Sequence, residues 1–351
     1  MGKIEIIGLG PGDFHQMPIG SYDIIKKSEH VYLRTEDHPA VAQLKEKGHS
    51  FKTYDFLYEK FNEDFEKVYP AIVDDLLEKS KNQDIVYAVP GHPMVAELTT
   101  QLLLQNDTGT DVKVMNGHSF IDDLFSAVQA DPVEGFQLVD GLDFQVESLS
   151  PDQHLIIMQV YHPMVAGDVK LDLMKIYPDD YPVARVDAAG SSQETVTWVP
   201  LYELDFFEGV HNLLSVYLPP LSPNKNWRSF ARSRDLTDQI FDFDQGDLWV
   251  LNQDHKSLWP YLEEESEELR QAIEEDDIDN MIEELGDVLL QVLYHSKVAE
   301  NEGFFSLEDI LESLNQKLYR RHPNVFGELE VDSIEELEQL WEDIKKDENG
   351  E

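Results

Sequence analysis

The sequence opens with an apolar segment that runs into a glycine-rich turn, Lys-Ile-Glu-Ile-Ile-Gly-Leu-Gly-Pro-Gly-Asp at residues 3–13. Its isoleucines are typical of a buried β-strand, and the glycines and proline between Gly8 and Asp13 end that strand in a tight turn. Two later strand-like segments end in the same way. Residues 84–89 lead into Pro-Gly-His-Pro at 90–93, and residues 112–115 lead into Asn-Gly-His-Ser at 116–119. This alternation of strand, turn and helix predicts a mostly parallel α/β domain.

The pattern becomes more mixed after Ser150. Strand-like segments at 154–160, 182–187, 195–200 and 212–218 surround one helical segment at 164–176, which indicates a second α/β lobe. The prolines in Leu-Pro-Pro-Leu-Ser-Pro at 218–223 then predict a linker, because proline fits neither a helix interior nor a central strand. Helical patterns follow near 256–274, 278–301, 306–319 and 334–346. We therefore expect a two-lobed α/β domain at 1–218, a linker at 219–240 and an all-α domain at 241–351.

The overall charge limits the partners of the chain. Among 351 residues, 27 are Lys or Arg and 71 are Asp or Glu, which gives a formal charge of −44. Such a chain repels nucleic acid and anionic membrane surfaces. The sequence starts without a signal-peptide pattern, and no apolar run approaches the roughly 18 residues of a membrane span. With no cysteine for disulfides or thiolate chemistry, we expect a cytoplasmic protein that binds neither nucleic acid nor membrane.

Two acidic clusters lie in neighbouring helical segments, Glu-Glu-Ser-Glu-Glu at 264–268 and Glu-Glu-Leu-Gly-Asp at 283–287. Glu265 and Glu268 are three residues apart, as are Glu284 and Asp287, so each pair shares a helix face with about 5–6 Å between its Cβ atoms. Four carboxylates at close quarters repel one another unless a hard cation lies among them. Oxygen ligands favour Mg²⁺, which takes further ligands from substrate phosphates. The alternative is a solvated acidic helix face.

Apolar side chains on the same two helices favour the metal site over that alternative. They recur at helical spacing, which predicts a core face on each helix. Carboxylates on a packing face are costly unless they are paired or bind a metal. The apolar positions are Leu262, Leu269, Ile273, Ile282, Leu285, Val288, Leu289, Val292 and Leu293.

Taken singly, the turns at 8–12, 90–93 and 116–119 are ordinary connections between a strand and a helix. Pro11 has no N–H for a phosphate cradle, and Ser119 is well placed to cap the helix that follows it. Taken together, they are three glycine-bearing turns at the carboxyl ends of strands, where open α/β sheets bind ligands. The sequence therefore predicts a small-molecule site at these turns.

A basic cluster, Lys-Leu-Tyr-Arg-Arg-His-Pro at 317–323, stands out in the acidic second half. Its cations could complement the dipole at the end of a helix before Pro323. They could equally hold an anionic phosphate group. The two roles are compatible with each other.

These motifs resemble two known families. Residues 1–218 are similar to the tetrapyrrole (corrin/porphyrin) methylases through Gly8–Asp13, 86–93, Asn116–Phe120 and Val183–Gly190. Residues from about 249 to 345 resemble the MazG-type nucleoside triphosphate pyrophosphohydrolases through the two acidic clusters and the segment 317–327. The order of the two halves is that of YabN-type fusion proteins.

The MazG resemblance implies Mg²⁺-dependent hydrolysis of a nucleoside triphosphate to a monophosphate and pyrophosphate. It implies that Glu265, Glu268, Glu284 and Asp287 bind the metal, that Glu264 accepts a proton from the attacking water, and that Lys317, Arg320 and Arg321 hold phosphate oxygens. It also implies a homodimer or a higher homo-oligomer.

The methylase resemblance implies a cleft for S-adenosylmethionine between two lobes. The residues expected to touch that cofactor are Pro11, Gly91, His92, Val95, His118 and Ser119. The family usually has Gly-Asp-Pro where this chain has Gly-His-Pro at 91–93, which removes an acid near the cleft. In the alternative interpretation, the protein binds S-adenosylmethionine or a tetrapyrrole, or acts as a methyltransferase, through this domain. The helical domain then serves only for oligomerisation.

Overall fold

The computed structural model describes residues 2–61, 64–327, 329, 331 and 333–349. The chain forms two compact units, Met1–Arg228 and Ser229–Glu351. A search of the described residues finds no helix that is both long and apolar enough to cross a membrane. The first unit is α/β with two sheets and the second is helical, which confirms the predicted fold class.

The first sheet contains five parallel strands in the order β3-β2-β4-β1-β5. Because all five are parallel, their carboxyl ends meet at one edge of the sheet. Helices lie between the strands along the chain, as the crossover connections of parallel strands require. The strands are β1 (Lys3–Gly8), β2 (Val31–Leu33), β3 (Lys52–Thr53), β4 (Ile85–Val89) and β5 (Asp111–Val114), and the helices are α1 (Ile19–Lys27), α2 (Pro39–Glu46), α3 (Asp55–Lys60), α4 (Phe65–Ser80) and α5 (Leu98–Leu104).

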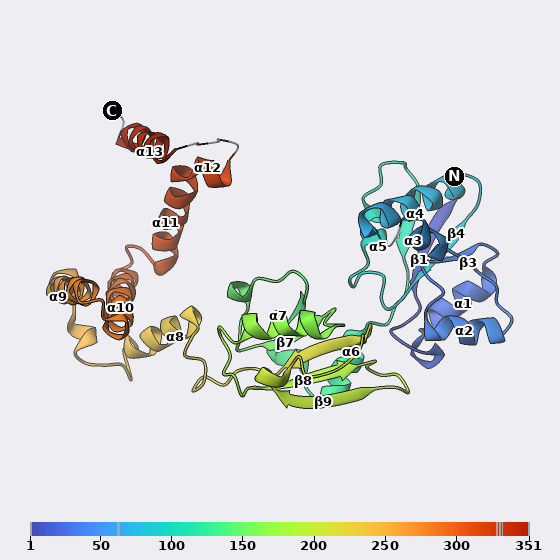
Figure 1. Cartoon of the computed structure of the whole chain (residues 1–351), viewed down its shortest axis with the longest axis horizontal. Coiled ribbons are helices and arrows are strands. Elements are labelled where there is room, and N and C mark those ends of the chain that lie inside the picture. The colour runs from blue at the N-terminus through green and yellow to red at the C-terminus, as the bar shows by residue number, and fades with distance from the viewer. Residues whose placement is uncertain (1, 62–63, 328, 330, 332, 350–351) are drawn as a thin grey trace. The chain divides into compact units, whose positions relative to one another are not determined.

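Both faces of this sheet are covered by helices (Figure 1). One face packs under α3, α4 and α5 and buries residues such as Ile4, Tyr87 and Ile72. The opposite face packs under α1 and α2 and buries Ile7 and Leu44. Strands buried on both faces read as continuous apolar runs, which is why the isoleucine-rich start of the chain forms the second-last strand of the sheet rather than an exposed edge.

The second sheet has five strands in the order β6-β7-β10-β8-β9 and is mixed. Only β6 and β7 are parallel, whereas the other neighbours are antiparallel. Helix α7 (Pro163–Leu173) packs on one face and α6 (Phe120–Val128) on the other. The strands are β6 (Phe136–Asp140), β7 (His154–Met158), β8 (Pro182–Asp187), β9 (Thr195–Pro200) and β10 (Leu214–Leu218).

The second unit is built from helices alone among its described residues. Helices α9 and α10 pack along each other (Figure 1) and are joined by a turn of three residues. A small core of Phe241, Val250, Leu258 and Val298 joins these helices to α8. The helices are α8 (Phe230–Ile240), α9 (His255–Glu274), α10 (Ile278–Glu302), α11 (Leu307–Arg321), α12 (Pro323–Phe326) and α13 (Ile334–Asn349).

The structure differs from the sequence expectations in three places. The predicted linker at 219–240 ends in helix α8, whose N-cap Ser229 accepts a hydrogen bond from the Arg232 N–H. The short elements α2, β3, α3 and β6 were not predicted, because segments of two to eight residues carry little periodicity. The predicted core faces of α9 and α10 are largely exposed: Ile273, Ile282, Leu285, Leu289 and Val292 are between 37% and 67% exposed.

Candidate functional site

The acidic clusters meet because α9 and α10 form a helical hairpin. Glu268 lies six residues before the end of α9, and Glu284 lies six residues after the start of α10. The two helices run back along each other, so these residues reach the same level of the hairpin. Oxygen atoms of Glu265, Glu268 and Glu284 lie within 4.8 Å of one another. Glu284 is only 6% exposed, Glu265 is half-buried and Glu268 is exposed.

Burial and the neighbouring negative charges raise the pKa values of two residues of this group. Burial, followed by the charges of Asp287 and Glu268, raises the pKa of Glu265. Burial, followed by the charges of Glu268 and Asp287, also raises the pKa of Glu284. Raised carboxyl pKa values are what an uncompensated cluster of like charges produces. A hard cation would relieve the repulsion, so the donor set fits Mg²⁺.

Of the other residues predicted for this site, Asp287 and Glu264 lie on the same two helices as the group, whereas the three basic residues lie on another helix. Asp287 is half-buried on α10 and acts on Glu265 and Glu284 through its charge, but it is outside the set of mutually close oxygens. Glu264 is exposed on α9. Lys317, Arg320 and Arg321 lie in the last turns of a different helix, α11.

In the first unit, the three glycine turns converge at the carboxyl edge of the parallel sheet. The Gly8 N–H donates to the Asn116 carbonyl at 2.6 Å, and Gly10 pairs with Gly91 in an antiparallel bridge. A Cβ atom at Gly8 would lie 2.1 Å from the Gly91 oxygen, and one at Gly117 would collide with Pro93. These glycines let backbone pack on backbone. Gly91 itself has a φ of +65° and open space where its Cβ would be.

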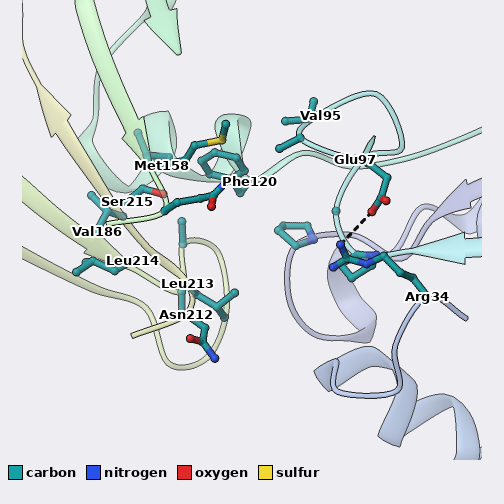
Figure 2. A pocket seen from close by; sticks show the side chains of 18 residues that line it. Arg34, Val95, Glu97, Phe120, Met158, Val186, Asn212, Leu213, Leu214 and Ser215 are labelled. Atoms are coloured by element: carbon teal, nitrogen blue, oxygen red, sulfur yellow. Dashed lines mark ion pairs between the residues drawn. The ribbon is translucent and has the colours of Figure 1, made fainter. Parts of the chain in front are cut away.

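A pocket of about 270 Å³ lies beside these turns, between the first sheet and the second (Figure 2). Its lining combines the turns of the first sheet with the ends of strands in the second. Three of the six residues predicted to touch a cofactor, Pro11, Gly91 and Val95, line it. Most of the remaining wall is apolar and comes from Phe120, Leu124, Met158, Val186, Leu213 and Leu214.

The other three predicted cofactor residues do not line this pocket and have local structural roles. The His92 Nδ1 accepts a hydrogen bond from the Met94 N–H at 3.1 Å. His118 contacts the Gln16 carbonyl at 3.0 Å and lies 3.5 Å from Asp123. Ser119 caps α6 by accepting a hydrogen bond from the Ile121 N–H. They were singled out because they follow strand ends, but the His92 and Ser119 side chains bond to the backbone just after them, and the His118 side chain contacts the backbone of Gln16.

Two charged residues that sequence reasoning missed lie in the pocket. Arg34 directly follows β2 and lies 3.4 Å from Glu97 in an ion pair drawn in Figure 2. Glu97 also accepts a 2.6 Å hydrogen bond from the Thr99 hydroxyl, which in turn lies 2.9 Å from the Tyr87 hydroxyl. Burial works against the Arg34 charge, but Glu97 raises the pKa of the guanidinium. The sequence did contain a signal for Arg34, because it is a charged residue at the carboxyl end of a buried strand, where α/β sheets bind ligands.

The pocket rim also concentrates unusual backbone conformations. Ala96, Gln159 and Ala188 have φ values of +52°, +62° and +50°, and all three line the pocket together with Gly91. Non-glycine residues with positive φ cost free energy and cluster at ligand sites. This strain is a second mark of the pocket as a functional site.

Two family models match the chain. The model for tetrapyrrole (corrin/porphyrin) methylases matches residues 3–205, and the model for the MazG nucleotide pyrophosphohydrolase domain matches residues 253–326. The chain therefore belongs to the tetrapyrrole methylase family and carries a MazG domain after its methylase-like unit. This confirms the fusion expected from the sequence and classes the chain among enzymes. The carboxylate group lies within the second match, and most of the pocket lining lies within the first.

Individual relatives show the same division. The chain is 45% identical over 352 residues to the uncharacterized protein YabN of Bacillus subtilis (strain 168), a match that covers 99% of this chain and 72% of that protein. It is 50% identical over 106 residues to the nucleoside triphosphate pyrophosphohydrolase/pyrophosphatase MazG of Thermotoga maritima, covering 30% of this chain and 40% of that protein. The nucleoside triphosphate pyrophosphohydrolase of Escherichia coli (strain K12) is 36% identical over 112 residues, with 43% of its length covered. The chain thus spans less than half of each of these two pyrophosphohydrolases.

Solved structures similar to the first unit include methyltransferases. A uroporphyrin-III C-methyltransferase of Thermus thermophilus has a TM-score of 0.48 at 17% identity and covers 63% of this chain and 95% of that one. A cobalt precorrin-4 methyltransferase has a TM-score of 0.49 at 16% identity and covers 62% of this chain and 94% of that one.

Proposed function

We propose that the helical unit hydrolyses nucleoside triphosphates to monophosphates and pyrophosphate with the help of Mg²⁺. The observation that carries this proposal is the group of three carboxylates, Glu265, Glu268 and Glu284, on two helices that lie inside the MazG match. The raised pKa values of Glu265 and Glu284 support it. They show that burial and like charges disfavour the ionised carboxylates, and a bound cation would offset that cost.

In this proposal the three carboxylates and Asp287 hold the metal. A bound Mg²⁺ neutralises charge on the phosphates and orients them for attack. Glu264, next to the group and exposed, accepts a proton from the attacking water. Lys317, Arg320 and Arg321 on α11 hold phosphate oxygens and give an anionic substrate an approach to a strongly acidic protein.

The test is pyrophosphate release from a mixture of nucleoside triphosphates in the presence of Mg²⁺. We expect Glu268→Gln and Asp287→Asn each to lower turnover on the order of a hundredfold or more, because metal stabilisation of the transition state contributes several kcal/mol. Glu263→Gln is the matched control, since Glu263 is an exposed carboxylate on the same helix outside the group. We expect this variant to keep its turnover.

Equal turnover of the two site variants and the control would overturn the site assignment. Absence of pyrophosphate release from the unmodified chain would favour the alternative, in which the helical unit serves only for oligomerisation.

For the first unit we propose binding of S-adenosylmethionine in the pocket lined by Pro11, Gly91 and Val95. The methylase-family match and the pocket at the carboxyl edge of a parallel sheet support this ligand. His92 is not among the residues that line the pocket, and its Nδ1 accepts a hydrogen bond from the Met94 N–H. Transfer of the methyl group to an acceptor is a further step that this proposal does not require.

Gly91→Ala tests the ligand assignment by calorimetry with S-adenosylhomocysteine, the demethylated product. We expect the unmodified chain to bind with a Kd near 1 μM, about −8 kcal/mol, and Gly91→Ala to bind at least about tenfold more weakly. Gly109→Ala is the matched control, because Gly109 has a φ of +74°, open space at its Cβ position and no place in the pocket lining. Both variants carry the same backbone strain, so equal affinity in the two would contradict the assignment.

A further inference from the structure

Arg34 places a cation in a pocket of a protein with 27 basic and 71 acidic residues. Its guanidinium pairs with Glu97, yet the two side chains are unequally covered. The Arg34 side chain is 23% exposed, whereas the Glu97 side chain is 3% exposed. Both residues line the pocket, but a molecule in it has more of the Arg34 side chain than of the Glu97 side chain to contact.

Much of the hydrogen-bonding capacity of Arg34 is not used by its ion partner. A guanidinium has five N–H donors in a rigid fork, and the contact with Glu97 involves one terminal nitrogen, Nη1. The Nε atom is buried and has no hydrogen-bond partner among the described residues. Because Nε is buried, the terminal nitrogens are the donors that an acceptor brought by a ligand would meet.

Glu97 fixes the direction of the guanidinium. One of its oxygens accepts from Thr99 at 2.6 Å, and the other faces Arg34 at 3.4 Å. The nearby Tyr58 and Tyr87 have raised pKa values because they are buried, so neither carries the negative charge that Arg34 would attract. Glu97 therefore acts as a positioning residue for Arg34.

The opposite wall is suited to the apolar body of a ligand. Figure 2 shows Met158 and Val186 of the second sheet, with Leu213 of the loop before β10, across the pocket from Arg34 and Glu97. A molecule with a flat or apolar body and one anionic end would fill both parts. Carboxylate is the anion that the guanidinium fork matches in a bidentate manner.

We infer that Arg34 binds the carboxylate of the ligand in this pocket and that this carboxylate is the amino-acid end of a nucleoside thioether or sulfonium. The inference rests on the proposed function of the pocket. It assigns the Arg34 end to the amino-acid group and the Met158 and Leu213 side to the nucleoside.

Two probes that differ in the amino-acid group test the inference on the full-length chain. S-adenosylhomocysteine carries the carboxylate, and 5′-methylthioadenosine has the same nucleoside thioether without the amino acid. We expect Arg34→Gln to weaken S-adenosylhomocysteine binding about tenfold to a hundredfold and to change 5′-methylthioadenosine binding less than about threefold. Arg34→Lys keeps the charge but loses the fork, so its loss for S-adenosylhomocysteine should be smaller than that of Arg34→Gln.

A structural role for Arg34 predicts a different result, namely equal weakening of both probes, and that result would overturn the inference. Unchanged affinity for S-adenosylhomocysteine in Arg34→Gln would overturn it too. Should Arg34→Gln fail to fold, Arg34→Lys makes the same comparison, with selective loss of the carboxylate-bearing probe as the supporting outcome. Binding of neither probe by the unmodified chain would instead reject the ligand proposed for the pocket, and with it this inference.

Discussion

His211 connects Asp187 of β8 with the loop that precedes β10. Its Nδ1 lies 2.6 Å from an Asp187 carboxylate oxygen, and its Nε2 lies 3.1 Å from the Glu208 carbonyl. Because both partners are acceptors, both ring nitrogens donate when the ring is protonated. The hydrogen bond to Asp187 and then the one to the Glu208 carbonyl raise the pKa of His211 above its ordinary value. The next residues along the chain, Asn212 and Leu213, line the pocket.

This arrangement predicts a pH dependence with a definite sign. A histidine whose pKa is raised by folding contributes stability that is fully present below its unfolded pKa of about 6.5 and is lost as the pH rises through its folded pKa. We expect chemical unfolding to show a stability difference between the unmodified chain and His211→Gln that is largest near about pH 6 and fades toward about pH 9. The difference should stay below about 1 kcal/mol, since the His211 side chain is 40% exposed and solvent screens the pair.

A difference that stays constant over this pH range would show that His211 acts through packing alone. Asp187→Asn provides the complementary check. It removes the charge partner, so the pH dependence of the histidine contribution should shrink in the same way.

At the scale of elements, α10 presents an apolar stripe that is exposed among the described residues of its own unit. Ile278, Ile282, Leu285, Leu289 and Val292 recur at alternating spacings of four and three residues and are 37–67% exposed. Apolar residues at this spacing form the contact seam between two helices that pack along each other, as in a coiled coil. The sequence predicted a core face here, and the apolar spacing is present, but these side chains are exposed in the described part of the helical unit. We propose that a second copy of the chain covers the stripe in a homo-oligomer.

Ile282→Glu tests this proposal because it adds a charge to the most exposed position of the stripe. We expect light scattering to show a smaller assembly for Ile282→Glu than for the unmodified chain, since burying an unpaired carboxylate in an interface costs several kcal/mol. Asn301→Glu adds the same charge at an exposed position of α10 outside the stripe and should leave the mass unchanged. An equal mass for all three proteins would reject the interface.

For the whole molecule, the formal charge of −44 makes electrostatic repulsion the dominant long-range interaction. Like charges repel across the folded surface, and unfolding lets them separate. Salt screens this repulsion: the Debye length falls from about 10 Å at 0.1 M to about 3 Å at 1 M. We therefore expect KCl over this range to raise Tm by at least about 4 °C, which corresponds to roughly 1 kcal/mol or more of added stability.

Sucrose serves as the control for this experiment, because it stabilises compact states without screening charge. The salt effect should be larger near about pH 8 than near about pH 4, where many carboxylates are protonated. A Tm that falls with KCl, or the same salt response at both pH values, would contradict charge repulsion as the cause.

Local patterns in the sequence determined the fold class, the helices α9 and α10, and the carboxylates that meet between them. Helical spacing placed Glu265 and Glu268 on one face of α9, and Glu284 and Asp287 on one face of α10. The short connection between the two helices brought these faces together in a hairpin. Strand ends marked by glycine likewise pointed to Pro11 and Gly91. In each case the information lies within a few residues, which is the range over which helical and strand periodicity act.

Only the tertiary structure decided which distant residues share a site. Arg34 and Glu97 meet because β2 and β4 are neighbours in the sheet and both end at the same edge, and strand order is not written in any local pattern. The same holds for Asp187 and His211, which come from β8 and the loop before β10. Packing also decided that the apolar face of α10 stays exposed, because burial depends on what the rest of the chain can bring to it.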